Sequence, residues 1–242
     1  MSFTVVIPAR LNSTRLENKL LLEIKNKPLF IHTAEQVSKS KATNIYIATD
    51  NQSIKDIAEN FGFMSIMTAE SHQSGTDRIN EAAQILSLED DHVLVNVQGD
   101  EPLVDFKLIN ELAENISNHN QFVSAYQKFK SFEDYKNKNN VKVALNMNNE
   151  AITFSRSMIG NLNDENFIDD LIYHHLGIYA YTVKQINDFC QIDSPKIEKV
   201  EKLEQMRAIF NDIPIKMIRY HGEEMIGVDT IEDFNKVKTL LG

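Results

Sequence analysis

Strand and helix signals alternate through the first half of the chain. Short runs rich in β-branched residues indicate strands, and the stretches between them carry residues that typically start and end helices. The predicted strands cover residues 3–7, 44–48, 64–67 and 93–98. The predicted helices cover residues 28–39, 53–61, 76–86 and 105–118. This order predicts a doubly wound α/β arrangement, in which helices cover both faces of a parallel sheet.

Single residues mark where these elements begin and end. Pro8 is expected to end the first strand, because a proline inside a sheet lacks a hydrogen-bond donor for the ladder. Pro28 opens the first helix, since proline is favoured in a first helical turn. Ser53 is the expected N-cap of the second helix, and Gly62 is expected to end that helix.

The second half of the chain begins with a strand-rich segment. Strands are predicted at residues 122–129, 141–145, 151–155 and 172–181. Short polar turns separate some of them, which favours antiparallel pairing. The remaining predictions are helices at 183–189, 196–210 and 230–241 and a strand at 215–220. We therefore expect one domain over residues 1–242, with a mixed, mostly parallel sheet and a strand-rich insertion over residues 122–182.

Composition and charge narrow the class of protein. A chain of 242 residues that is 42% hydrophobic can bury a sizeable core. The formal net charge of −10 argues against a nucleic-acid partner, which normally meets a basic surface. A local cluster of Arg and Lys could still serve a phosphorylated substrate. The single cysteine, Cys190, excludes an internal disulfide and is expected to be a small buried residue in a reducing compartment.

The sequence offers no membrane-targeting signal. The apolar run at the N-terminus is too short for a secretory signal and has no basic residues before it. No window approaches the roughly 18 apolar residues of a membrane span. We therefore expect a cytoplasmic protein with no membrane partner.

The loop after the first strand gathers positive charge. Arg10, Arg15 and Lys19 lie on it, at what should be the carboxyl edge of the sheet, where ligands bind in such folds. Arginine presents a planar fork to phosphate oxygens and lysine a mobile point charge. The loop has no glycine, so side chains rather than backbone would neutralise a triphosphate. A solvated basic loop is the alternative.

Two acidic residues are candidate ligands for Mg²⁺. Asp100 follows a strand in the segment QGDEP, and Asp229 precedes the last helix. Adjacent side chains point in opposite directions, so only one of Asp100 and Glu101 is expected to face the site. Mg²⁺ usually takes one or two carboxylates and completes its shell with substrate oxygens and water. The alternatives are that Asp100 only turns the chain and that Asp229 or Thr230 caps the helix.

Three further segments hold candidates for ligand contact. The Ser74-Gly75 turn exposes backbone N–H groups at a helix start and could contact a base or a sugar, unless Ser74 or Thr76 is a plain N-cap. Arg156 at a strand end could hold an anion, whereas His175 within a strand is more often a core histidine. Glu204 is expected near the core beside a helical apolar stripe, where it needs a partner. The stripe consists of Val200, Leu203, Met206 and Phe210.

Taken together, these segments resemble the 3-deoxy-manno-octulosonate (Kdo) cytidylyltransferases, also called CMP-Kdo synthetases. The resemblance runs in one order from residue 7 almost to the end of the chain. It is carried by IPAR, STRL and Lys19 (7–19), ATD (48–50), HQSGTDR (72–78), VNVQGDEP (95–102), VKVAL (141–145), FSRS (154–157), HLGIYAY (175–181), LEQMR (203–207) and GVDTIED (227–233). HQSGT, VNVQGDEP and HLGIY distinguish this family from other nucleotidyltransferases.

The resemblance implies a role for each matching residue. Arg10, Arg15 and Lys19 would neutralise the phosphates of CTP, while Asp100 and Asp229 would hold Mg²⁺. The implied nucleotide contacts are Ala9, Arg10, Ser74, Gly75 and Asp100. The implied sugar contacts are Arg78, Gln98, Arg156, His175, Tyr179, Glu204 and Gln205. Arg156 would meet the negative charge of the sugar.

The resemblance also implies the fold, the reaction and the assembly. The fold would be that of the nucleotide-diphospho-sugar transferases, and the enzyme would be a homodimer with part of its contact in the strand-rich insertion. It would transfer CMP from CTP to Kdo for lipopolysaccharide biosynthesis. An 8-amino-Kdo or another acidic sugar such as a sialic acid is the nearest alternative.

Two alternatives from other classes fit the sequence less well. A catalytically inactive sensor would be expected to lose Lys19, Asp100 or Asp229, and all three are present. A dinucleotide-binding oxidoreductase would carry GxGxxG after the first strand, which this chain lacks.

Overall fold

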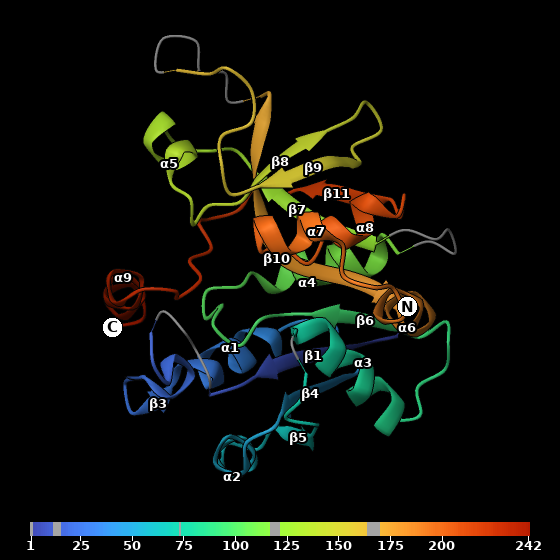
Figure 1. The fold of residues 1–242 in the computed structure, drawn as a ribbon. Helices are drawn as coiled ribbons and strands as arrows, with labels where there is room; N and C mark the ends of the chain where they lie inside the picture. Colours follow the sequence, from blue (N-terminus) through green and yellow to red (C-terminus); the bar gives the residue numbers. More distant parts are fainter. Residues whose placement is uncertain (1, 12–15, 73, 117–121, 164–169) are drawn as a thin grey trace.

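A single mixed sheet organises the molecule (Figure 1). The computed structural model describes residues 2–11, 16–72, 74–116, 122–163 and 170–242, and within them the sheet has nine strands. Its strand order is β11-β7-β10-β6-β1-β4-β5, and β8 pairs with both β10 and β9. The predicted mixed α/β fold is therefore confirmed.

The N-terminal half supplies the parallel part of the sheet. Its strands are β1 (Phe3–Ala9), β4 (Asn44–Thr49), β5 (Met64–Met67) and β6 (Val93–Asn96). The helices that follow them are α1 (Leu29–Val37), α2 (Gln52–Asn60), α3 (Gly75–Ile85) and α4 (Phe106–Glu114). Val5 and Ile7 of β1 pack in one core with α1, α2 and α4, while Val6 packs with α3 on the opposite face. The alternation of side chains along β1 thus places helices on both faces of the sheet.

The C-terminal half adds the antiparallel part. Its strands are β7 (Phe122–Gln127), β8 (Lys142–Leu145), β9 (Ala151–Ser155), β10 (Ile172–Thr182) and β11 (Ile215–Arg219). The 11-residue β10 runs antiparallel to β6, β7 and β8, so it joins the two halves. The β8–β9 pair and the short helix α5 (Phe132–Lys136) stand above the parallel half in Figure 1.

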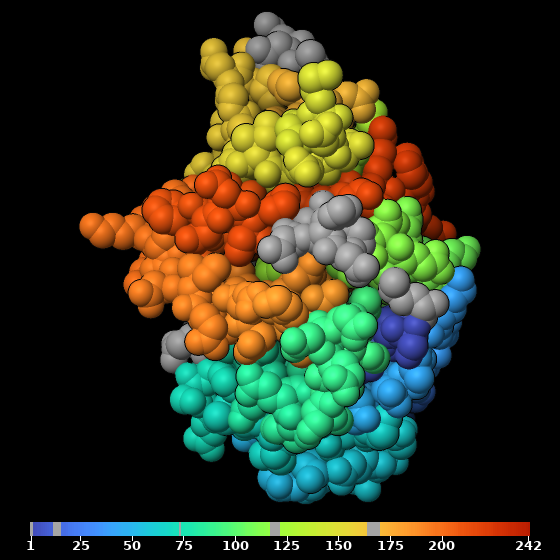
Figure 2. Space-filling model, turned by 90° about the vertical axis from the view of Figure 1, so that its right-hand side faces the viewer, coloured from blue at the N-terminus to red at the C-terminus, as the bar shows by residue number. Residues whose placement is uncertain are grey.

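Four further helices lie in the C-terminal half. They are α6 (Val183–Cys190), α7 (Lys196–Glu201), α8 (Met206–Phe210) and α9 (Ile231–Leu241). Figure 2 shows the C-terminal segments and the β8–β9 region stacked over the N-terminal half. None of the helices in the described ranges is long and apolar enough to cross a membrane.

Two residues act differently from their predicted roles. Pro8 does not end β1, because the strand continues to Ala9. The ladder to β6 ends at Val6, so the missing N–H of Pro8 lies where no neighbouring strand requires a donor. The N-cap of α2 is Asn51 rather than Ser53, and its side chain accepts hydrogen bonds from the N–H groups of Ser53 and Ile54.

The predicted helix over residues 196–210 is two short helices. The backbone of Lys202 is left-handed, with φ of 54°, and its N–H bonds the carbonyl of Glu198 to end α7. With the helix broken, Val200 is 75% exposed to solvent and Phe210 is 66% exposed, so the predicted apolar stripe does not form. Glu204 consequently lies in a turn between α7 and α8 instead of on a helix.

Three short elements have no counterpart in the sequence prediction. They are α5, the 3-10 helix η1 (Lys19–Leu21) and the small hairpin of β2 (Glu23–Ile24) and β3 (Lys27–Pro28). The hairpin contributes Ile24 to a cluster with Leu29, Val228, Phe234 and Val237, so it anchors the C-terminal helix α9 beside the first loop. Elements this short carry too few residues for a periodic pattern.

Candidate active site

A cavity of about 760 Å³ lies where β1 and β6 end. Asn96 at the end of β6 and the residues Val97, Gln98, Asp100 and Glu101 after it form one side of the cavity, and residues 174–179 of β10 form another. The turn between α7 and α8 and the segment before α9 complete the walls. Its position at the carboxyl ends of parallel strands is where open α/β sheets bind ligands.

Lys19 joins two carboxylates at one end of this cavity. Its ammonium contacts Asp100 and lies 2.9 Å from Oδ1 of Asp229. Burial acts to lower the pKa of Lys19, but the two carboxylates raise it above its usual value. Thr230 is the N-cap of α9, in a capping box with Asp233. The cap therefore leaves the carboxylate of Asp229 to face Lys19.

Glu101 also lines the cavity, which corrects the expectation that only Asp100 would do so. The strand β6 ends at Asn96, and the N–H of Glu101 bonds the carbonyl of Gln98, so a turn replaces strand alternation here. An added Cβ at Gly227 would lie 2.5 Å from Oε1 of Glu101. Burial and the negative charges of Asp100 and Asp229 raise the pKa of Glu101 to about 8.

The acidic cluster has the composition of a weakly protein-bound magnesium site. In the described part of the chain, no group of three or more His, Cys, Asp and Glu is placed to hold a metal by itself. Asp100 and Asp229 converge on one ammonium, and burial together with the charges of these two carboxylates raises the pKa of Glu101. Mg²⁺ in proteins is usually bound by one or two carboxylates, with substrate oxygens and water as its other ligands. Asp100 and Asp229 could supply the two carboxylates, so these residues fit the ion.

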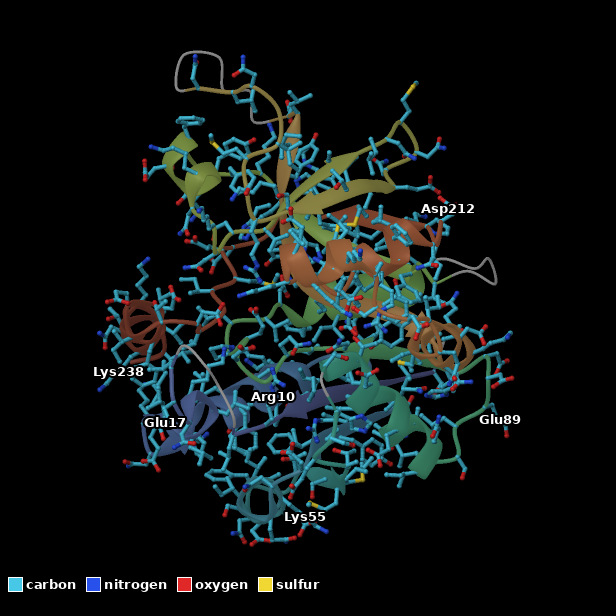
Figure 3. The ribbon with its side chains drawn as sticks, viewed as in Figure 1. Arg10, Glu17, Lys55, Glu89, Asp212 and Lys238 are labelled. Atoms are coloured by element: carbon cyan, nitrogen blue, oxygen red, sulfur yellow. The ribbon has the colours of Figure 1, made fainter. Side chains whose placement is uncertain are left out.

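The basic loop reaches the same cavity at its start. Ala9 is buried as the last residue of β1, and Arg10 lines the cavity directly after it. Figure 3 shows Arg10 within the N-terminal half. Arg15 lies outside the described residues.

Ser74 and Gly75 have different roles at the start of α3. Ser74 is the N-cap, as one alternative predicted, because its Oγ accepts a hydrogen bond from the N–H of Asp77. Gly75 lines the cavity, where an added Cβ would lie 3.4 Å from Pro8 and 3.5 Å from Gln98. The close packing of Gly75 brings the backbone of this turn to the cavity wall.

Arg78 is not among the residues that line the cavity, and its place among the sugar contacts stays a prediction. The side chain is 2% exposed on the buried face of α3. Its Nη2 lies 2.6 Å from Oδ2 of Asp50, and its Nη1 donates to Thr68. Arg78 thus neutralises a buried carboxylate and ties α3 to the residues that follow β4 and β5.

The other predicted sugar contacts are brought together along the cavity. These are Gln98, Arg156, His175, Tyr179, Glu204 and Gln205. His175 is also the core histidine that the alternative predicted. Its Nε2 lies 3.1 Å from the hydroxyl of Ser124, and its ring packs on Phe154. Burial, with a smaller effect from His174, lowers its pKa to about 3, so the ring is neutral at ordinary pH.

Buried polar atoms without partners also line the cavity. Glu204 accepts a hydrogen bond of 2.7 Å from Thr76 through Oε2, while its Oε1 lies 3.8 Å from Arg207. Within the described ranges, Oε1 of Glu204 and the hydroxyls of Tyr179 and Tyr181 are buried and have no hydrogen-bond partner. Buried polar atoms are normally paired, so these three suggest contact with a hydroxylated ligand. Tyr181 had no assigned role from the sequence, and only its alternation with Tyr179 on β10 could have drawn attention to it.

Arg156 lies in the turn directly after β9. Its Nη1 lies 3.4 Å from the carbonyl of Lys138, in the loop that follows α5. Both segments line the cavity, so this side chain spans its wall. A guanidinium in this position can bind an anionic group of a ligand.

The chain is similar to known proteins over nearly its whole length. The sequence profile of the cytidylyltransferase family matches residues 4–217. A 3-deoxy-manno-octulosonate cytidylyltransferase of Francisella tularensis subsp. novicida is 43% identical over 242 residues, which covers 98% of this chain and 97% of that protein. The enzyme of the same name from a Nitratiruptor species is 39% identical over 238 residues, which covers 96% of this chain and 97% of that protein.

Solved structures agree with this similarity. The structure of a CMP:2-keto-3-deoxy-manno-octonic acid synthetase complexed with CTP has a TM-score of 0.88 at 30% identity, and covers 99% of this chain and 98% of that one. A cytidylyltransferase from Leptospira borgpetersenii has a TM-score of 0.61 at 17% identity, and covers 98% of this chain and 85% of that one. The second likeness shows a shared fold alone.

Proposed function

We propose, from the premise that this chain belongs to the 3-deoxy-manno-octulosonate cytidylyltransferase family, that it transfers CMP from CTP to the anomeric hydroxyl of Kdo. The products are CMP-Kdo and pyrophosphate, and the reaction serves lipopolysaccharide biosynthesis. The observation that carries the proposal is the meeting of Lys19, Asp100 and Asp229 at one end of a cavity large enough for both substrates.

The protein contributes alignment and charge rather than covalent chemistry. The anomeric hydroxyl attacks the α-phosphorus of CTP, the bond to the β-phosphate oxygen breaks, and pyrophosphate leaves. Lys19 and Arg10 offset the charge that develops on the phosphates, and Arg15 of the same loop is proposed to do so too. No dedicated general base is assigned. Arg156 at the cavity wall binds the sugar carboxylate and so holds the hydroxyl in line for attack.

Asp100 and Asp229 are the residues proposed to hold Mg²⁺. When bound there, the ion would neutralise phosphate charge and lower the pKa of the attacking hydroxyl. The Ser74-Gly75 turn and the nearby end of β1 contact the cytosine and ribose, with Gly75 as the residue that faces the cavity. Gln98, His175, Tyr179, Glu204 and Gln205 surround the sugar.

Pyrophosphate release tests this function. The purified protein is incubated with Mg²⁺, CTP and, in turn, Kdo, its 8-amino analogue and a sialic acid, with UTP and GTP as nucleotide controls. We expect turnover with CTP and Kdo that disappears when Mg²⁺ is chelated. Turnover with UTP or GTP at the same rate would contradict the cytosine assignment, and activity after chelation would contradict the magnesium assignment.

The 8-amino sugar is the second candidate substrate. The buried Oε1 of Glu204 has no hydrogen-bond partner in the described ranges, and a carboxylate oxygen accepts from an ammonium as well as from a hydroxyl. The ratio of kcat/KM for the two sugars decides between these substrates.

We also propose that the enzyme is a cytoplasmic homodimer whose contact includes the strand-rich insertion. Ile152 on β9 is 54% exposed, and in the described part of the chain β9 pairs with β8 and forms no second ladder. An exposed apolar residue on a free strand edge is a common basis for association. Sedimentation of the wild type and of Ile152→Lys checks this, because the substitution is expected to shift a dimer toward monomer.

A further inference from the structure

Lys142 is a buried lysine that the proposed reaction does not use. It lies on β8 with 0% of its surface exposed, and in the described part of the chain it forms no ion pair. Its ammonium donates to the carbonyl of Asn137 at 2.7 Å and to the carbonyl of Arg156 at 3.0 Å. Lysine is almost never buried without a carboxylate partner, because desolvation of the charge is costly. A feature this costly invites a functional explanation.

Both carbonyls belong to segments that line the cavity. Asn137 begins the loop after α5, and Arg156 follows β9. The guanidinium of Arg156 returns to the same loop at the carbonyl of Lys138, 3.4 Å away. Lys142 therefore joins the two segments from beneath, while the side chain of Arg156 joins them at the cavity wall.

Glu201 of α7 holds the other side of the same residue. Its Oε2 accepts from the backbone N–H of Arg156 at 3.1 Å and from the hydroxyl of Ser155 at 3.1 Å. The N–H of Arg156 is thus bonded to the acidic side chain of Glu201 from α7, and its C=O is bonded to the basic side chain of Lys142 from β8. Charge-assisted hydrogen bonds are roughly twice as strong as neutral ones, so they fix the turn more firmly than β9 alone would.

We propose that Lys142 and Glu201 are positioning residues, which hold the backbone of Arg156 so that its guanidinium meets the carboxylate of the acidic sugar. We call this pair the Arg156 clamp. The inference rests on the proposed function, in which Arg156 binds the sugar. The clamp acts through Arg156 and touches neither substrate nor metal. Its loss therefore weakens sugar binding and leaves the cluster of Lys19, Asp100 and Asp229, which is proposed to serve the nucleotide, unchanged.

Four clamp variants test this in the full-length enzyme. Lys142→Met and Glu201→Ala remove the two bonds, whereas Lys142→Arg and Glu201→Gln keep a donor and an acceptor. KM for Kdo, KM for CTP, kcat and the thermal midpoint are measured for each. Lys184→Met is the matched control, because Lys184 is an exposed lysine paired with Asp188 and does not line the cavity.

We expect Lys142→Met and Glu201→Ala to raise the KM for Kdo roughly tenfold, the effect of a lost charge-assisted hydrogen bond, with less than about a twofold change in the KM for CTP. Lys142→Arg and Glu201→Gln should restore most of this loss. A purely structural role would instead change both KM values and kcat in step with the thermal midpoint, without rescue, and this result would overturn the proposal. If Lys142→Met does not fold, the half-buried Glu201 provides the same test.

Arg156→Ala distinguishes a failure of the clamp from a failure of the proposed sugar-binding role of Arg156. If it leaves the KM for Kdo unchanged, the assignment of Arg156 in the proposed function is wrong and the clamp has no role in binding. If Arg156→Ala raises the KM for Kdo and Glu201→Ala does not, the clamp is wrong while the proposed function stands.

Discussion

The two groups of cavity residues to which the proposed function assigns the nucleotide and the sugar, here called the nucleotide end and the sugar end, are built in different ways. At the nucleotide end, Lys19, Asp100 and Asp229 meet through direct ion pairs; Lys19 begins η1, Asp100 follows β6 and Asp229 precedes α9. At the sugar end, Arg156 is held through its backbone by residues from β8 and α7, and Tyr179, Tyr181 and Glu204 present unpaired polar atoms within the described ranges. The first end depends on charge placed at the carboxyl edge of the sheet. The second depends on buried support beneath the residues that face the ligand.

The largest expected effect lies at the nucleotide end. Asp100→Asn and Asp229→Asn each keep the shape of the side chain but remove its charge, so turnover should fall by about 10²–10³, as for other lost electrostatic contacts to a transition state. Asp212→Asn is the control, because Asp212 is exposed and far from this end of the cavity (Figure 3). Steady-state kcat and circular dichroism check the result. Normal turnover with either variant would show that the acidic cluster has no part in the reaction.

Tyr181→Phe tests the sugar end with a smaller change. The hydroxyl of Tyr181 is buried, and the side chain is 2% exposed in a wall of the cavity. Its removal takes away at most a weak contact with Asn96, so stability should change little. If the hydroxyl binds the sugar, the KM for Kdo should rise about 3- to 10-fold, the effect of one neutral hydrogen bond.

Tyr173→Phe is the matched control for this variant. Its hydroxyl donates to the carbonyl of Asp170, and it does not line the cavity. Equal KM values for Kdo in the wild type and Tyr181→Phe would remove Tyr181 from the sugar site. The comparison between the two ends would then rest on Arg156 and Glu204.

The smallest effect is a dependence of sugar binding on pH. Burial, together with Arg156, lowers the pKa of Lys142 to about 8, so the ammonium is charged below this pH and loses its proton as the pH rises through it. The KM for Kdo should therefore be constant from pH 6.5 to 7.5 and increase by a few-fold toward pH 9.

The groups around Lys142 do not titrate in this interval. Arg156 keeps its charge, burial lowers the pKa of His174 to about 4, and burial raises the pKa of Tyr135. Lys142→Arg should make the pH profile flat, because an arginine stays protonated. A profile that is the same in this variant and in the wild type would assign the pH dependence to another group.

The nucleotide end was also the more predictable from sequence. Lys19, Asp100 and Asp229 were all candidates, because loops after parallel strands share one edge of the sheet. Glu101 was missed because the chain turns after Asn96, and strand alternation no longer applies. Ser74 could not be separated from a plain N-cap by sequence, and the structure shows that it is one.

The sugar end depends on tertiary detail that short-range patterns do not contain. The apolar spacing over residues 196–210 predicted one helix, and the left-handed backbone at Lys202 divides it and turns Glu204 into the cavity. The resemblance implies Arg78 as a sugar contact, but in the structure it neutralises Asp50 from the buried face of α3. The burial of Lys142 on β8 likewise follows from the packing of α5 and β9 around it, not from the local pattern of residues.

The bond between Lys19 and Asp229 has a consequence for the timing of activity in the cell. It connects positions that are 210 residues apart, and the backbone of Val228 is in turn bonded to that of Asp100. A nascent chain whose last segment is still inside the ribosome can form the early strands and helices but cannot complete this cluster. Under the proposed function, a chain that ends before Asp229 is therefore expected to lack turnover.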